Sequence, residues 1–328
     1  PICWRLIVAG DAKTPPLETA GAYEALSLDE QFGFGRCFGL ELPRLLPENH
    51  SARKNTGYLA AIAAGADLLY ETDDDNAPLK HWSAVPDPRS PFVSTHTLAP
   101  GDDGATTCNV YAHFAPDAGC WPRGYPLERV AHEAEPQMIV GGAHEIGVWQ
   151  AMADDDPDVD AIWRLTRPGP VRFARRDPVS LAPGVWCPVN SQNTCWRRDA
   201  FRWLYLPATT TMRVCDILRG YIAQRCLWAD GLRVGFHGAT VRQERNEHDL
   251  LRDLDEETLL YTRASELLRL LEGLPVEDWA PDERLVSIYR ALASAGFVHR
   301  KEMDLVEAWS DDIERLVSAG ATAREAAA

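Results

Sequence analysis

Hydrophobic and polar residues alternate in short blocks along most of the chain. Residues 4–9 form an apolar run that predicts a strand, and Gly10 ends it. Similar strand-like and helical blocks continue to about residue 245, separated by proline-rich loops such as 86–91 and 168–183. This order favours an α/β fold in which a mixed sheet is flanked by helices and carries long loops.

A helix and a buried strand are predicted directly before a run of acidic residues. Leu59, Ile62 and Ala63 recur at helical spacing, and Gly65 stands where a C-cap is expected. Residues 67–71 then predict a short strand that ends just before three aspartates.

Beyond residue 250 the apolar spacing becomes helical throughout. Its three stripes are Leu259, Leu260, Leu267, Leu268 and Leu271, then Leu285, Ile288 and Leu292, then residues 305–316. We therefore expect an α/β domain at residues 1–249 and a small helical bundle at residues 250–328. The bundle is a candidate for packing on the larger domain, for homo-oligomer formation or for a membrane surface, but its many acidic residues disfavour the membrane.

The three aspartates Asp73, Asp74 and Asp75 follow the end of the predicted strand. Side chains alternate along an extended chain, so Asp73 and Asp75 are expected on one side and Asp74 on the other. Two carboxylates on one side can bind a hard divalent cation that keeps open positions for phosphates. The plain alternative is a solvated acidic turn, which is what most aspartate runs are.

Polar residues also follow the first predicted strand. Asp11, Lys13 and Thr14 come directly after Gly10. A first strand that delivers polar groups at its C-terminal end is the usual way in which an open α/β sheet meets a nucleotide. An ordinary polar turn is the alternative.

Five motifs together carry a resemblance to a known family. They are Lys54-Asn-Thr-Gly-Tyr58, Tyr70-Glu-Thr-Asp-Asp-Asp-Asn76, Asn190-Ser-Gln-Asn-Thr194, Cys215-Asp-Ile-Leu-Arg-Gly-Tyr-Ile-Ala-Gln-Arg225 and Glu244-Arg-Asn-Glu-His-Asp-Leu250. The combination is similar to the STELLO-type glycosyltransferase domain and more distantly resembles the reversibly glycosylated polypeptides, the UDP-arabinopyranose mutases. The likeness covers roughly residues 4–260 and implies a GT-A fold that binds a nucleotide sugar through a divalent metal.

The same resemblance implies a metal site and a catalytic residue. Asp73 and Asp75 fall on the metal-binding Asp-x-Asp motif for Mn²⁺ or Mg²⁺, and His248 is the candidate for a late histidine ligand. His237, which ends a strand-like segment, is expected to be structural. Asp216 falls on the acidic residue beneath the acceptor side of the sugar, so it is the predicted catalytic base.

A larger set is expected near the donor. By the resemblance, it comprises Asp11, Lys13, Arg53, Lys54, Asn55, Asp73, Asp74, Arg123 and Asn193. Arg123 belongs to a segment with a counterpart in the mutases, Trp121-Pro-Arg-Gly-Tyr-Pro-Leu127, which could equally be a rigid, proline-braced loop.

The chemistry of such a site is consistent with these residue types. Cleavage of a sugar from a nucleoside diphosphate places negative charge on the departing phosphate, which a metal and a lysine stabilise. An inverting reaction needs a carboxylate that accepts the acceptor's proton, whereas a retaining reaction does not. The sequence leaves both outcomes open.

Three functions therefore remain in order of preference. The first is transfer from a nucleotide sugar, expected to be a UDP-sugar, to a glycan or other acceptor. The second is a nucleotide-sugar mutase, although the chain lacks an obvious counterpart of the arginine that those proteins glycosylate on themselves. The third is a non-catalytic scaffold for glycan synthases, which has no physical need for crowded carboxylates.

Two further motifs carry less weight. The acidic run at residues 154–160 imitates a calcium loop but lacks the required glycine and bidentate glutamate. Asp158 or Asp160 within it could contact donor or acceptor, or form a plain turn. The glycines at residues 33–39 have the wrong spacing for a dinucleotide loop, and no hydrophobic strand precedes them.

Composition agrees with a sizeable domain that does not bind nucleic acid. The chain has 328 residues, 45% of them hydrophobic, and a formal charge of −16, which disfavours phosphate backbones. No apolar run approaches the length of a membrane span, and no signal peptide is recognised, although the first residue is not Met. Eight scattered cysteines favour buried thiols in a reducing cytoplasm, with bridges 108–120 or 187–195 left open.

Overall fold

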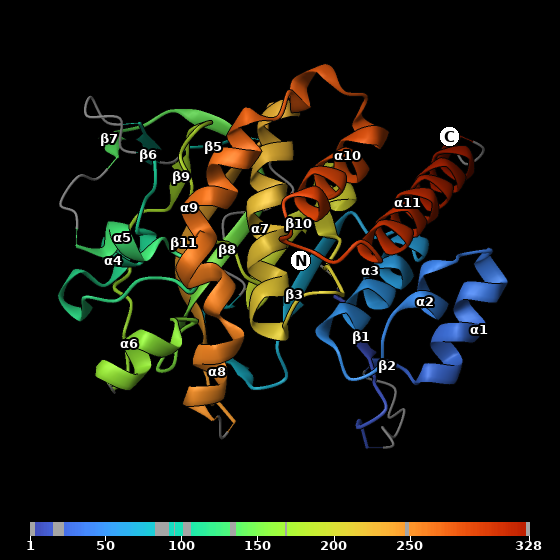
Figure 1. The fold of residues 1–328 in the computed structure, drawn as a ribbon, viewed down its shortest axis with the longest axis horizontal. Coiled ribbons are helices and arrows are strands. Elements are labelled where there is room, and N and C mark those ends of the chain that lie inside the picture. The colour runs from blue at the N-terminus through green and yellow to red at the C-terminus, as the bar shows by residue number, and fades with distance from the viewer. Residues whose placement is uncertain are drawn as a thin grey trace. The chain divides into compact units, whose positions relative to one another are not determined.

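In the computed structural model the chain forms two compact units (Figure 1). The first unit contains residues 1–67, 202–215 and 279–328, and the second contains residues 68–201 and 216–278. Within them the structure describes residues 4–15, 23–82, 92–94, 96–100, 106–131, 136–167, 169–246 and 249–325.

The first unit is built around a two-stranded parallel sheet. Strand β1 (Leu6–Ala9) pairs with β2 (Tyr23–Leu26). The helices of this unit are α1 (Leu28–Phe38), α2 (Leu42–Leu45), α3 (Lys54–Ala63), α10 (Pro281–Ser294) and α11 (Glu302–Glu325). α3 packs on β1 and on α11, which also packs on α10. The segments nearest the two ends of the chain therefore share one core.

Local sequence explains how α1 begins and ends. Ser27 and Glu30 form a capping box, in which each side chain binds the backbone N–H of the other. At the C-terminus Gly39 adopts the left-handed conformation, with φ of 66°, which glycine reaches without steric cost.

The second unit is built around a nine-stranded mixed sheet. Its principal order is β3-β10-β8-β11-β9-β6-β7, while β4 pairs with β11 and β5 pairs with β8. The strands are β3 (Leu68–Thr72), β4 (Asn76–Pro78), β5 (Phe92–Ser94), β6 (His96–Ala99), β7 (Gln137–Ile139), β8 (Ala143–Asp154), β9 (Val179–Leu181), β10 (Asn193–Arg197) and β11 (Arg233–Gln243). β11 runs parallel to β8 but antiparallel to β4 and β9.

The helices of the second unit include two long ones. These are α7 (Met212–Ala229), which belongs to this unit from residue 216 onward, and α9 (Thr258–Gly273). Arg225 of α7 donates to the Leu271 and Leu274 carbonyls, which ties α7 to the C-terminal end of α9. The two helices lie side by side in Figure 1. The shorter helices are α4 (Val110–Phe114), α5 (Leu127–Val130), α6 (Ala161–Thr166) and α8 (Leu250–Glu256).

A glycine in α7 brings this helix close to the loop that precedes β10. A Cβ atom at Gly220 would lie 2.1 Å from the Val189 carbonyl oxygen. Only glycine permits this approach, and the approach places the helix beside residues 190–192, which become important below.

The predicted α/β fold with a mixed sheet is confirmed. Helix α3 covers the predicted helical pattern, and β3 begins one residue later than the predicted strand. Gly65 has φ of 82° and follows the capping residue Ala64. The first predicted strand forms as β1, but it pairs with β2 rather than with the large sheet.

The three C-terminal stripes form helices α9, α10 and α11 as predicted. They do not share one unit, because α9 clusters with the large sheet while α10 and α11 cluster with the N-terminal segments. The predicted domain boundary after residue 249 stays a prediction.

Two further observations concern disulfide bonds and membrane-spanning helices. All seven described cysteines are free, and six of them are buried, so neither of the two bridges left open above forms. Within the described residues, every helix is too short or too polar to cross a bilayer.

Candidate functional site

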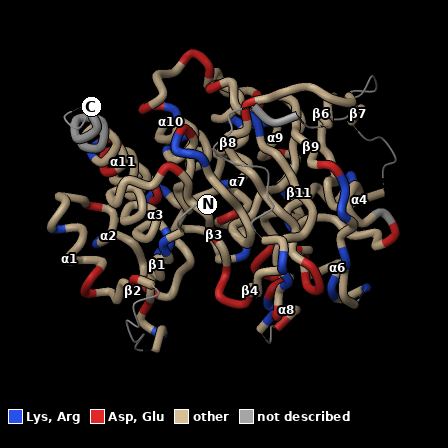
Figure 2. The backbone as a smooth tube through the Cα atoms, turned by 180° about the vertical axis from the view of Figure 1, so that it is seen from behind, with Lys and Arg blue, Asp and Glu red and all other residues tan. Residues whose placement is uncertain are grey.

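The three aspartates form a turn between β3 and β4, here named the acidic turn (Asp73, Asp74 and Asp75). It appears as a red segment beside β4 in Figure 2. Asp74 is exposed, whereas Asp73 and Asp75 are half-buried. This difference in exposure follows the alternation that the sequence predicted for the three side chains.

Asp75 is held by the end of β11 through side chain and backbone. Its Oδ2 accepts a hydrogen bond from Gln243 Nε2 at 2.9 Å, and its carbonyl accepts from Glu244 N at 2.8 Å. Its second carboxylate oxygen, Oδ1, is buried and has no hydrogen-bond partner among the described residues. The Oδ1 atom of the next residue, Asn76, is in the same state.

These two oxygens suit a divalent cation in their chemistry. Mg²⁺ and Mn²⁺ prefer carboxylate and amide oxygens, and a buried acceptor without a partner costs free energy unless something binds it. Within the described residues no group of three or more His, Cys, Asp and Glu side chains could hold a metal. The predicted third ligand, His248, lies outside the described residues. Asp75 and Asn76 each offer an oxygen of the type that Mg²⁺ and Mn²⁺ bind, and a bound phosphate or water would have to supply further ligands.

Arg123 stands at the centre of a second acidic group. Its Nε and Nη2 bind the Asp158 carboxylate at 2.8 Å each, and its Nη1 and Nη2 bind Asp216 at 3.0 and 2.9 Å. Burial acts to lower the pKa of Arg123, but the charges of Asp158 and Asp216 outweigh it and raise that pKa well above the usual value. The predicted phosphate contact is thus fully engaged by two carboxylates.

Asp216 is equally occupied. Besides Arg123 it accepts hydrogen bonds from Ser191 N at 3.2 Å and from Ile217 N at 2.9 Å. Its side chain is 9% exposed. These four hydrogen bonds, two of them from Arg123, favour a positioning role. The predicted role as a base stays a prediction.

A third buried acid, Glu71 in β3, is also compensated by arginine. Arg219 of α7 binds its two oxygens at 2.7 and 3.0 Å, and Trp196 Nε1 donates to it at 2.8 Å. Glu71, Asp158 and Asp216 therefore each face a guanidinium. Asp75 instead accepts a hydrogen bond from the neutral amide of Gln243.

The Asn190–Thr194 motif connects these groups. Asn190 Nδ2 donates to Asp158 at 2.9 Å, and Gln192 Nε2 donates to Gln243 Oε1 at 2.6 Å. The Gln192 carbonyl accepts from Asn76 Nδ2 at 2.9 Å. Four of the motifs that carried the family resemblance thus meet in one hydrogen-bonded network of the second unit.

Asn193, a predicted donor contact, is part of the interior of this network. Its Nδ2 donates to the Met152 carbonyl at 2.8 Å and to Thr240 Oγ1 at 3.0 Å, and its Oδ1 accepts from the Tyr70 hydroxyl. With 1% exposure it holds strands together. Contact with a donor stays a prediction.

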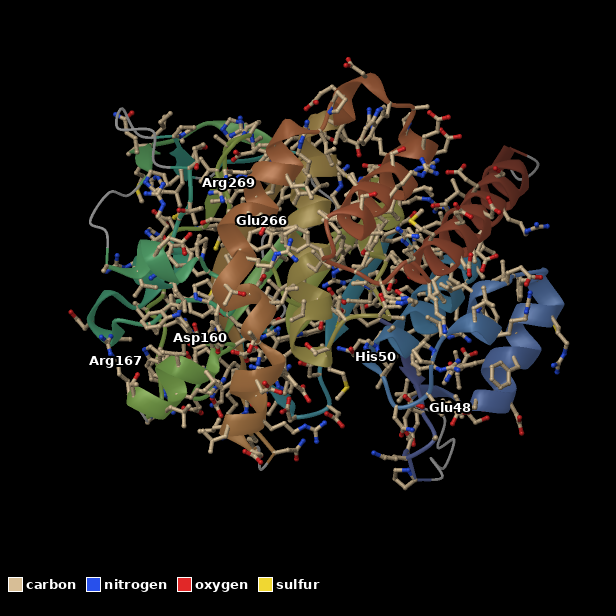
Figure 3. The ribbon with its side chains drawn as sticks, in the orientation of Figure 1. Glu48, His50, Asp160, Arg167, Glu266 and Arg269 are labelled. Atoms are coloured by element: carbon tan, nitrogen blue, oxygen red, sulfur yellow. The ribbon has the colours of Figure 1, made fainter. Side chains whose placement is uncertain are left out.

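In the first unit the turn after β1 is organised by Asp11. Its Oδ1 accepts from Ala12 N at 2.7 Å, its Oδ2 accepts from His50 N at 3.0 Å, and Thr14 N donates to its carbonyl at 2.9 Å. Lys13 is exposed at the tip of the turn. Figure 3 labels His50, whose ring contacts the Ala52 N–H and the Thr210 carbonyl.

Two residues predicted near the diphosphate support the interior of the first unit instead. Arg53 donates to the carbonyls of Pro43 at 2.9 Å and Leu46 at 2.7 Å, and burial lowers its pKa. Asn55 binds the backbone N–H and carbonyl of Leu206 at 2.9 and 2.8 Å. Their neighbour Lys54 is half-buried. Their donor-binding roles stay predictions, and for Arg53 and Asn55 the observed contacts explain these residues without a ligand.

Asp160 has a structural role at the start of α6 (Figure 3). It caps this helix by accepting from Trp163 N at 2.8 Å, and it also accepts from Trp121 Nε1. Burial raises the pKa of Asp160 to about 6.

Sequence reasoning missed Gln243, Glu71 and Arg219. Glu71 and Arg219 lie inside motifs that carry the family resemblance, but only the aspartates of those two motifs are predicted site residues. Gln243 directly precedes the Glu244–Leu250 motif, in which His248 is the one predicted site residue. An acid inside a predicted strand, such as Glu71, is a usable signal because it needs a buried cationic partner.

Comparisons with known proteins agree with the motifs. A family model for STELLO glycosyltransferases matches residues 213–319. Two relatives from Arabidopsis thaliana, named Probable glycosyltransferase STELLO1 and Probable glycosyltransferase STELLO2, are 30% and 29% identical to this chain. Each alignment covers 94% of the chain but 41% of the relative, so the chain spans less than half the length of these proteins. The distant likeness to the mutases stays a prediction, whereas the main resemblance is confirmed: the chain is similar to STELLO glycosyltransferases over 94% of its length.

Proposed function

We propose that this chain is the nucleotide-sugar-binding part of a metal-dependent glycosyltransferase. The donor is a nucleotide sugar, with a UDP-sugar as the first candidate, and the acceptor is a glycan. The names of the relatives support transfer of a sugar, and the acidic turn supports the dependence on Mn²⁺ or Mg²⁺.

One observation carries the proposal. In the second unit Glu71, Asp158 and Asp216 have arginine partners, whereas the Asp75 side chain accepts from a neutral amide. Its buried Oδ1 lacks a partner within the described residues. An uncompensated, half-buried carboxylate is unfavourable by itself and becomes favourable when a cation binds.

The residues divide the chemical work as follows. Asp75, with Asp73 beside it, would hold the cation, which when bound supplies Lewis-acid stabilisation of the departing diphosphate. The Asn76 Oδ1 atom offers a further neutral ligand or a hydrogen-bond acceptor. In the first unit, Lys13 and Asp11 remain the candidates for nucleotide contacts.

The surroundings of Asp216 bear on the stereochemistry. Since Arg123 neutralises this carboxylate, we assign Asp216 to the positioning of Arg123 and Ser191. A reaction that retains the configuration of the sugar needs no enzymic base and agrees with this assignment. The anomeric configuration of an isolated product tests it.

The compartment is part of the proposal. Six of the seven described cysteines are buried free thiols, which supports a reducing cytoplasm. Thiol titration of the unfolded protein, purified without reductant, should then give free thiols rather than bridges.

Ligand-dependent thermal unfolding tests the proposal. The whole chain is heated with a panel of nucleoside diphosphates and nucleotide sugars, with and without Mn²⁺, because a ligand that binds only the folded state raises the midpoint. We expect one nucleotide to raise it by several degrees only when Mn²⁺ is present. No shift across the panel would instead indicate a non-catalytic scaffold.

Asp75→Asn is the decisive variant, because it removes one charge and keeps the shape. It should abolish the Mn²⁺-dependent shift while leaving the metal-free midpoint equal or higher, since an uncompensated charge is gone. Asp74→Asn is the matched control at the exposed position of the same turn. Equal shifts in wild type and Asp75→Asn would contradict the proposed metal site.

A further inference from the structure

The two glutamines Gln192 and Gln243, here named the amide pair, form a chain of hydrogen bonds that ends on Asp75. Gln192 Nε2 donates to Gln243 Oε1 at 2.6 Å, and Gln243 Nε2 donates to Asp75 Oδ2 at 2.9 Å. A carboxylate only accepts, so the NH₂ end of the Gln243 amide faces Asp75 and its Oε1 is left to accept from Gln192.

Backbone contacts fix both members of the amide pair. Gln243 is the last residue of β11 and pairs with Asn76 in β4, directly beside Asp75. The Gln192 backbone donates to Asn190 Oδ1 at 3.1 Å and accepts from Asn76 Nδ2 at 2.9 Å. Gln192 is 5% exposed and Gln243 is 9% exposed. Two buried side chains thus form a hydrogen-bonded chain that ends on Oδ2 of the half-buried Asp75.

The donor to Asp75 is neutral, and this distinguishes it from Glu71, Asp158 and Asp216, each of which binds a guanidinium. A guanidinium would orient a carboxylate equally well, as Arg123 and Arg219 do for Asp158 and Glu71, but it would also cancel the charge. An amide fixes the rotamer and leaves the charge available for a cation.

We propose that Gln243, oriented by Gln192, is a positioning residue that holds Asp75 with its Oδ1 turned to a divalent cation and its charge uncompensated. This inference rests on the proposed function, because it concerns the same cation. It goes further by assigning the affinity for the cation to residues outside the acidic turn.

Calorimetric titration of the whole chain with MnCl₂ tests the inference, with the unfolding midpoint of each variant recorded in parallel. Gln243→Met keeps the length of the side chain but removes the donor, and it should weaken Mn²⁺ binding about tenfold or more, the usual loss when a ligand's support is removed. Gln243→Lys places an ammonium beside Asp75 and should weaken binding more than Gln243→Met does. Gln192→Met should weaken it less than either.

A buried glutamine elsewhere provides the control. Gln224 in α7 donates to the Cys187 and Gly220 carbonyls, so Gln224→Met disturbs a buried amide away from Asp75 and should leave Mn²⁺ affinity unchanged. The larger loss in Gln243→Lys than in Gln243→Met is a charge effect that a purely structural role would not produce. If Gln243→Met does not fold, the comparison of Gln243→Lys and Gln192→Met with wild type decides.

The outcomes separate this inference from the proposed function. Wild-type binding together with the graded losses supports both. Wild-type binding that is unchanged in folded variants of Gln243 overturns the inference and leaves the proposed function standing. If wild type binds no Mn²⁺, alone or with nucleoside diphosphates, the proposed metal dependence itself is overturned.

Discussion

Glu71, Asp158 and Asp216 in the second unit form one group of acidic residues, those with an arginine partner, and Asp75 with an amide partner forms a second. Asp160, which accepts from Trp121 and Trp163, belongs to neither. The first group resembles buried ion pairs in general, where removal of one partner costs much more than the pair contributes. The second resembles a binding site, where stability is given up locally for a ligand. The distinction is visible only when the partners of each carboxylate are known.

Arg123 gives the sharpest test of the first group. Arg123→Met should lower the free energy of unfolding by about 3–5 kcal/mol, because it leaves two buried carboxylates facing each other without a cation. Urea denaturation at neutral pH measures this loss. The triple variant that adds Asp158→Asn and Asp216→Asn should recover part of it, and a single-variant loss below about 1 kcal/mol would contradict the described network.

Asp160 gives a prediction about pH. Its folded-state pKa of about 6 lies above its ordinary value of 3.8, so folding favours the protonated form. Its contribution to stability is therefore complete below pH 3.8 and is lost as the pH rises towards 6. Asp160→Asn removes this dependence.

Chemical unfolding of Asp160→Asn and wild type from pH 4 to pH 7 measures the effect. Relative to wild type, the variant should gain at most about 2–3 kcal/mol across this range, on top of a constant offset from the altered bond to Trp121. Parallel curves for the two proteins would rule out the raised pKa of Asp160.

At the scale of elements, α7 places Asp216 and Arg219 against loop 190–192, and Gly220 sets how close the helix can come. Gly220→Ala should lower the free energy of unfolding by about 1–3 kcal/mol, because the new methyl group meets the Val189 backbone. Gly273→Ala, at the end of α9, is the matched control, since a Cβ there meets nothing within 4 Å. It should be neutral or stabilising by up to about 1 kcal/mol, as for Gly to Ala in a helix. Thermal unfolding of both variants decides whether α7 packs this closely.

The elements also show why some features could be predicted and others could not. α3 and β3 follow from apolar spacing within 20 residues of sequence, and the acidic turn follows from its place after a strand. The support of Asp75 by Gln243 joins positions 168 residues apart through the pairing of β4 with β11. No local pattern contains that register.

Polar motifs were the other source of difference. Arg53, Asn55 and Asn193 are predicted donor contacts by the family resemblance. Their side chains bind backbone carbonyls in the structure, and contact with a donor stays a prediction. A sequence gives the residue type but not the partners of its side chain. A polar residue that stabilises the fold and one that binds a ligand therefore look alike in the sequence.

At the scale of the whole molecule, α11 binds two segments that lie far before it in the sequence. Asp312 accepts hydrogen bonds from Glu41 N and Leu42 N, and Glu302 accepts from Ala208 N and Thr209 N. Val306, Trp309 and Ile313 of α11 are buried, and each contributes about 1.5–3 kcal/mol. The N-terminal sheet and its helices therefore depend on the C-terminal helices.

A chain truncated after residue 278 tests this dependence. We expect α1, α2 and α3 to lose protection in hydrogen exchange and to become sensitive to proteases, because they lack the surface that α11 covers. Full-length chain with Leu251→Ala, a change at an exposed position, is the control and should keep full protection. Retained protection in the truncated chain would show that the N-terminal segments fold without α11.

The discontinuity of the first unit also has a consequence during synthesis. The chain passes between the units at residues 67/68, 201/202, 215/216 and 278/279, so the pieces of the first unit leave the ribosome at widely separated times. The large sheet can assemble as soon as residue 278 has emerged, while α2 and α3 wait for α11, on which they pack. Nascent chains stalled before α11 should therefore be the stage at which this protein most depends on chaperones.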